Sequence, residues 1–213
     1  MRLKRSRIAV LGAAALMLTL TACAPPGQEG TPGVAATVGD VVVTNQQVDD
    51  TYSAWLYDTK GKDAANRRQV LTIALLSPAL LAKCKELGYP ITPATAASYA
   101  TQWLAFKGVQ GTPSEDMITA TQGILALYVL ANVDPTLDAV RQVSDSVAAS
   151  AVVSPRSGEY STDALIDSVK KAMQSAQDQQ LGSQFSFTEF QNVSAFTDES
   201  RPWFDRGSTT PAS

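Results

Sequence analysis

The stretch from residue 36 to residue 48 constrains the fold most, because it joins two apolar segments through a turn and leads into a helix. It reads Ala-Thr-Val-Gly-Asp-Val-Val-Val-Thr-Asn-Gln-Gln-Val. Gly39-Asp40 is a two-residue turn signal between β-branched residues, which predicts a strand pair or one bent strand over 34–43. Thr44 and Gln47 have the spacing of a capping box, in which the threonine oxygen accepts the amide of the third helical residue. A helix is therefore expected to start directly after the second strand.

Helical periodicity governs most of the remaining chain. Apolar residues recur at three- and four-residue steps and predict helices over about 44–57, 64–87, 92–106, 114–131 and 134–149, with a weaker pattern over 162–179. Pro78 interrupts the second pattern, so we expect either a kink or two closely spaced helices there. Asp134-Pro135 is expected to open the fifth helix, with proline in its first turn.

A short apolar segment, Ala151-Val152-Val153, follows the fifth predicted helix and is ended by Ser154-Pro155. It is expected to form a strand that pairs with Val38–Val43. The predicted fold is therefore mainly α, a helical domain with a small β-pair formed by the strand before the first helix and a strand after the last. We expect this domain to cover residues 34–160, with a C-terminal helix and a partly disordered tail over 161–213.

The composition narrows the classes of function. The chain has 213 residues, which allows one domain, and it contains no histidine. The commonest general base and the commonest metal ligand are thereby removed. Outside the basic leader the chain carries 13 basic and 20 acidic residues, a formal net charge of −7. Such an acidic chain is a poor candidate for binding nucleic acid, and no cofactor is predicted.

The first residues have the organisation of an export signal. Met1–Arg7 is basic, and Ile8–Leu20 is an apolar run too short for a comfortable membrane span. The run ends in Leu20-Thr21-Ala22-Cys23, which resembles the lipobox of bacterial lipoproteins. That resemblance implies removal of residues 1–22 and attachment of a diacylglyceryl group to Cys23. The alternative is an ordinary secretory leader, cut near the same position.

Residues 23–33 are rich in proline and glycine and show no periodicity, so they are expected to form a flexible tether. Two acyl chains would hold the protein durably on a membrane. The expected location is the extracytoplasmic face of the cell membrane, with the folded domain following the tether.

Several motifs, taken in order, resemble the N-terminal domain of the SurA-like extracytoplasmic chaperones. These are the strand, Val38-Gly39-Asp40 and the second strand, then Leu80-Leu81-x-x-Cys84-x-x-Leu87-Gly88-Tyr89-x-Ile91-Thr92, and finally Val152-Val153-Ser154-Pro155-Arg156-Ser157-Gly158. In the last motif Ser154 and Ser157 replace the asparagine and tyrosine that are common in the family. The resemblance covers about residues 34–158 and implies a helical cradle for unfolded or extended polypeptides. The parvulin isomerase domain of many family members uses histidines, so isomerase activity is not expected here.

Bulky aromatic residues are the candidates for contact with such a polypeptide. They are Tyr52, Trp55, Tyr99, Trp103 and Phe106, and they lie on helical faces that would also build a core. Core packing and an open apolar groove are therefore both compatible with their spacing. A membrane-docking face fits the acidic charge less well.

The remaining reactive groups give weak signals for catalysis. Cys84 shares an apolar stripe with Leu80 and Leu87, which indicates a buried inert thiol, although flanking lysines would lower its pKa if it were exposed. Three pairs of adjacent acids occur, at Asp49-Asp50, Glu115-Asp116 and Asp198-Glu199. Adjacent side chains do not face each other on a helix, so these acids are more typical of a solvated surface than of a catalytic acid–base pair.

These observations predict a lipid-anchored, chaperone-like binding module rather than an enzyme. The alternative is an accessory envelope lipoprotein that binds one folded protein partner.

Overall fold

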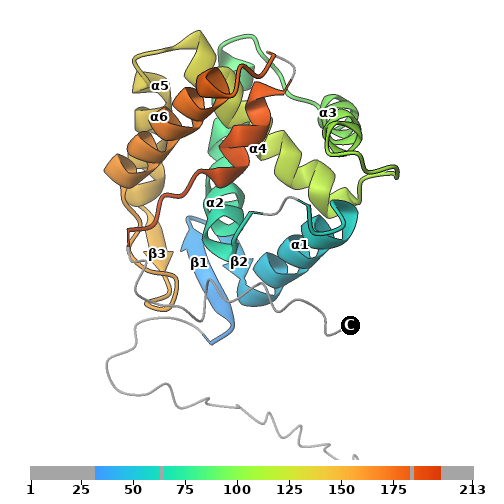
Figure 1. Cartoon of the computed structure of the whole chain (residues 1–213). Coiled ribbons are helices and arrows are strands. Elements are labelled where there is room, and N and C mark those ends of the chain that lie inside the picture. The colour runs from blue at the N-terminus through green and yellow to red at the C-terminus, as the bar shows by residue number, and fades with distance from the viewer. Residues whose placement is uncertain (1–31, 63–64, 183–184, 198–213) are drawn as a thin grey trace, which may run out of the picture.

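The computed structural model describes residues 32–62, 65–182 and 185–197 of the chain. Figure 1 shows a small sheet at the lower end of the view, with the helices above and beside it. The elements follow the order β1-β2-α1-α2-α3-α4-α5-β3-α6-η1, in which η1 is a 3-10 helix. The mainly helical fold class with a small sheet is confirmed.

The sheet is antiparallel and has three strands in the order β2-β1-β3. The central strand β1 (Val34–Val38) pairs with β2 (Val41–Thr44) on one side and with β3 (Ala151–Val153) on the other. Gly39 has a φ of 56° and occupies the first position of the two-residue turn, where a positive φ favours glycine.

The prediction that the late strand returns to the first β segment is confirmed, but its expected partner was partly wrong. β3 pairs with Ala36–Val38, and not with Val41–Val43. The two-residue turn folds β2 onto one edge of β1, so β3 occupies the opposite edge. The Ser154 amide extends this contact by donating to the Ala35 carbonyl at 2.9 Å.

Helix α1 (Asn45–Asp58) begins as predicted, because Thr44 and Gln47 form a reciprocal capping box. The Gln47 amide donates to Thr44 Oγ1 at 3.1 Å, and the Thr44 amide donates to Gln47 Oε1 at 2.8 Å. Helix α2 (Arg67–Glu86) begins with a second capping box, formed by Asn66 and Gln69. It continues through Pro78 as one helix, so the alternative of two separate helices is wrong.

Helices α3 (Pro93–Phe106) and α4 (Glu115–Val133) start close to where their predicted ranges begin. Each is capped by the preceding residue, Thr92 or Ser114, whose side chain accepts the amide of the third helical residue. Helix α5 (Asp138–Ala148) starts later than expected. Asp134 instead organises a turn, in which its carboxylate accepts the Thr136 amide at 3.1 Å and the Ala139 amide at 2.9 Å. These bonds satisfy the turn and the amide of the second helical residue together, so the helix begins after Leu137.

The C-terminal elements α6 (Thr162–Asp178) and η1 (Ser186–Asn192) pack into the same core as the preceding helices. The core has two clusters. The larger one lies among the helices and includes Trp103, Leu127 and Phe187, and the smaller one joins the sheet to α2 through residues such as Val43 and Leu71. α4 runs through the centre of the larger cluster, with α2 as its main neighbour.

Candidate functional site

The two candidate tryptophans lie inside the helical core. Trp55 is 1% exposed and Trp103 is fully buried. Their rings meet edge to face at a centroid distance of 5.0 Å, and Trp103 makes a second edge-to-face contact with Phe187 at 5.8 Å. Edge-to-face pairs place the positive rim of one ring against the negative face of the other. Core packing therefore accounts for both tryptophans, and the structure gives neither of them a face for a ligand.

The other three candidates do not form one surface. Tyr52 is buried, with the Arg67 guanidinium 4.8 Å from its ring centroid. Tyr99 is half-buried and packs edge to face on Phe187 at 5.2 Å. Phe106 is 45% exposed and stacks on Phe185 at 4.4 Å. Of the five predicted contact residues, Phe106 presents the largest fraction of its side chain to solvent.

An apolar groove, called here the β2 groove, lies elsewhere. It opens between β2, the first half of α1, the middle of α2 and the start of α4, and its volume is about 520 Å³. Ligand pockets in proteins usually measure roughly 300–1,000 Å³. Its lining is mainly aliphatic and includes Val41, Val42, Val48, Val70, Ile73, Ala74, Leu81 and Ala120. Val42 is 50% exposed and Val41 39% exposed, so apolar surface remains open to a ligand.

The β2 groove adjoins an unpaired strand edge. Because β2 is the outer strand of the sheet, one side of it has no strand partner among the described residues. In an antiparallel hairpin the residues that flank a two-residue turn exchange both hydrogen bonds, and the next pair exchanges none. Val38 and Val41 flank the turn, so the peptide groups of Val42 point away from β1. The groove thus combines apolar side chains with a backbone donor and acceptor that have no strand partner in the part of the chain that the structure describes.

The opposite edge of the sheet differs. Val152 on β3 is 58% exposed, but β3 has only three residues and is followed by Ser154-Pro155. The hollow beside β3 is lined in part by Pro155, Glu159 and Tyr160. Proline has no backbone N–H to donate, so a proline next to an edge strand makes that edge less able to pair with another strand. β2 is therefore the edge better suited to receive another chain.

Sequence reasoning missed the β2 groove residues. Val41-Val42-Val43 was read as a strand only, although three consecutive valines put apolar side chains on both faces of a strand. Val43 points into the smaller core cluster, whereas Val41 and Val42 remain partly exposed. That excess of apolar surface is the signal that the sequence contained.

Comparison with protein-family models, with curated proteins and with solved structures returned no match. The resemblance to SurA-like chaperones accordingly rests on the sequence motifs.

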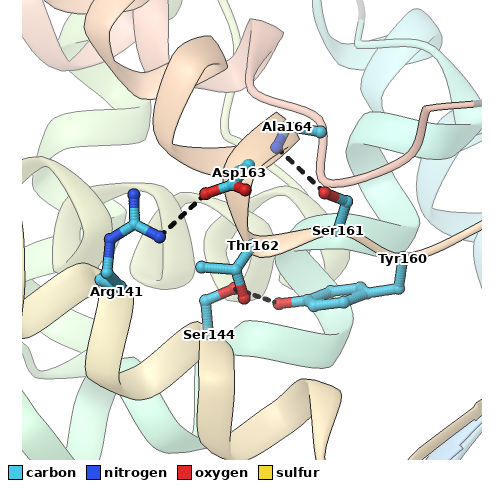
Figure 2. Close-up of polar contacts among 7 residues, drawn as sticks. All are labelled: Arg141, Ser144, Tyr160, Ser161, Thr162, Asp163 and Ala164. Carbon is cyan, nitrogen blue, oxygen red and sulfur yellow. Dashed lines mark hydrogen bonds and ion pairs between the residues drawn. The ribbon is translucent and has the colours of Figure 1, made fainter.

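A cluster of hydroxyl groups joins α5 to the start of α6 (Figure 2). Ser144 Oγ lies 2.9 Å from Tyr160 Oη and 2.9 Å from Thr162 Oγ1, and Arg141 Nη1 donates to Asp163 Oδ1 at 2.9 Å. Burial raises the pKa of Tyr160 to about 12, so this phenol stays protonated at neutral pH and is a poor general base. The cluster ties two helices together.

The thiol of Cys84 is buried, as its position on an apolar stripe predicted. Its Sγ donates to the Ala126 carbonyl at 3.4 Å. Burial raises its pKa to about 11, which disfavours the nucleophilic thiolate. Cys23, the predicted lipid-attachment residue, lies outside the described residues.

Among the described residues, no group of three or more Cys, Asp or Glu side chains is placed to hold a metal ion. Helix α4 is long and apolar enough to cross a membrane by length and composition, but 56% of the window concerned is buried. Its position at the centre of the helical core accounts for that composition.

Proposed function

We propose that this protein is a lipid-anchored, extracytoplasmic chaperone-like module that binds unfolded or extended polypeptides without covalent chemistry. The β2 groove is the observation that carries the proposal. It offers open aliphatic surface beside a free strand edge, and extended chains are commonly bound through their backbone at an edge and through side chains in an adjoining pocket. The lipobox and the tether support attachment to the outer face of the membrane.

In this proposal the client binds at the β2 groove and not at the tryptophans. An extended client would lie along β2 and place apolar side chains between α1, α2 and α4. The buried rings of Trp55, Trp103 and Phe187, called here the aromatic cluster, would then belong to the core against which the helices pack. Rigid helices on three sides would keep the groove open without a client, which lowers the ordering cost of binding.

Aggregation of an unfolded client enzyme tests the proposal. The chain from residue 24 onward, which contains every described residue, is expected to suppress light scattering at molar excess. Val42→Lys introduces a charge at the free edge of β2 and should abolish most of this effect. Val152→Lys is the matched control, because it places the same charge on the opposite edge strand, where suppression should persist.

Two outcomes would count against the proposal. Unchanged aggregation with the wild-type chain would remove the chaperone function. Equal suppression by both lysine variants would place binding away from the β2 groove. Crosslinking in cells adds a further test, because one stoichiometric folded partner would favour an accessory lipoprotein instead.

Membrane attachment is tested separately. Mass spectrometry of the mature protein should find an acylated amino terminus at Cys23, and Cys23→Ala should move the protein out of the membrane fraction. An intact leader with an unmodified Cys23 would exclude the lipid anchor.

A further inference from the structure

The charged side chains that line the β2 groove are both acidic. Asp50 of α1 and Asp116 of α4 line it, whereas none of its lining residues is basic. Within the described part of the chain, neither carboxylate has an ion pair or a side-chain hydrogen bond. The adjacent Asp49, by contrast, is paired with Arg67. The groove therefore carries two exposed carboxylates that have no basic partner among residues 32–62, 65–182 and 185–197.

We infer that the β2 groove selects extended segments in which apolar residues are accompanied by Lys or Arg, and that the segment adds to β2 as a further strand. This specificity rests on the proposed function. An apolar side chain would fill the aliphatic part of the groove, and a basic side chain would reach Asp50 and Asp116 at its rim. The long apolar stem of Lys or Arg can cover groove surface while its charged end stays in water.

The strand geometry supports the same mode of binding. β2 has four residues, so about four residues of a partner can run alongside it. Val42 directs its N–H and C=O outward, which offers one donor and one acceptor to that partner. Side chains on an added strand alternate between two faces, so only every second residue would enter the groove.

Peptide binding to the full-length protein in nanodiscs provides the test. The probes are three fluorescent peptides with alternating apolar residues, which carry either two lysines, two glutamines or two glutamates at the same positions. Fluorescence anisotropy should show about fivefold tighter binding of the lysine peptide than of the glutamine peptide, and weaker binding of the glutamate peptide. The preference should shrink as salt is added.

Two protein variants separate local charge from net charge. Asp50→Asn with Asp116→Asn should remove the preference for lysine while retaining affinity for the glutamine peptide. Glu115→Gln with Asp167→Asn changes the net charge equally at exposed positions that do not line the groove, and should retain the preference. The preference would have another origin if it persisted in the first variant or vanished in the second.

Methylation of the peptide backbone tests the added strand. N-methyl groups at one set of alternate residues should reduce affinity at least about tenfold, and the other set should have little effect, because only alternate amides face a neighbouring strand. Equal effects of both sets would overturn strand addition. Equal affinity for all three charge variants would overturn the charge preference but leave the proposed function intact, whereas no binding of any peptide would overturn both.

Discussion

The aromatic cluster and the β2 groove are both apolar, yet one is filled and the other is open. Trp55 and Trp103 are enclosed by their own helices and by Phe187. In the β2 groove, valines at the edge of the sheet keep 39% and 50% of their surface exposed. The large aromatic side chains are thus packed in the core of this fold, and the small aliphatic ones at the β2 groove stay exposed.

The difference shows that the size of an apolar residue is a poor guide to whether its side chain stays exposed. A tryptophan on a helical face removes so much apolar area from water when buried that the helices close over it. The β2 groove instead remains open, since the small valine and alanine side chains on β2, α1, α2 and α4 leave space between them. Changes on the filled side should therefore alter stability, and changes on the open side should alter binding.

The largest loss of stability is expected from removing a buried ring of the aromatic cluster. Trp103→Ala removes a fully buried indole that contacts Trp55 and Phe187, and should lower the free energy of unfolding by about 3–5 kcal/mol. Urea denaturation followed by circular dichroism measures this loss. Phe106→Ala is the matched control at a half-exposed site and should cost about 1 kcal/mol or less. Similar costs for both would contradict the assignment of Trp103 to the core.

A smaller loss is expected where α4 meets α2. A Cβ added at Gly123 would overlap Ser77 Oγ and lie 2.8 Å from Ile73 Cγ2, so Gly123→Ala requires these side chains or the two helices to shift. We expect a cost of about 1–3 kcal/mol. Adding Ser77→Ala removes the closest atom and should recover part of the stability, which a double-mutant cycle measures. No recovery would mean that the clash is relieved in some other way.

Local signals let the sequence predict the elements well. Thr44 with Gln47, Thr92 with Pro93, and Ser114 each specify a helix start through bonds within a few residues, and the structure has all three. Asp134-Pro135 misled because the carboxylate reaches past the proline to the Ala139 amide. The partner of β3 was misassigned because pairing across the chain depends on which edge of β1 the hairpin leaves free.

The site was much harder to predict than the elements. Helical periodicity shows that Trp55 and Trp103 share an apolar face, but a core and an open groove need the same periodicity. Phe187 and Phe190 were not assigned to a helix from the sequence, for a different reason. They lie three residues apart in a 3-10 helix, which has three residues per turn, so both point inward; two aromatic residues in an element of seven residues are too few to show a helical period.

The buried thiol of Cys84 gives a pH-dependent prediction. Burial raises the pKa of Cys84 from 9.0 to about 11, so between these values the unfolded chain loses a thiol proton that the folded chain keeps. The stability associated with the protonated thiol is complete below about pH 9 and is lost as the pH rises toward 11. Urea denaturation at about pH 8 and about pH 10 should show a decrease that Cys84→Ala makes smaller.

Thiol reactivity checks the same enclosure directly. An aromatic disulfide reagent should label Cys84 rapidly in urea and slowly in the native protein. Rapid labelling of the native state would show that the core opens more readily than the packing indicates.

The smallest change in stability is expected from filling the β2 groove. Thr119 is exposed and lines the β2 groove, so Thr119→Trp places an indole over the groove without entering the core. Thr101→Trp is the matched control on an exposed position of α3. Both variants should keep the free energy of unfolding within about 0.5 kcal/mol of the wild type. Only Thr119→Trp should weaken client binding, because its new side chain occupies the space that a client needs. Equal binding by the two variants would show that the open region, like the filled one, serves the fold alone.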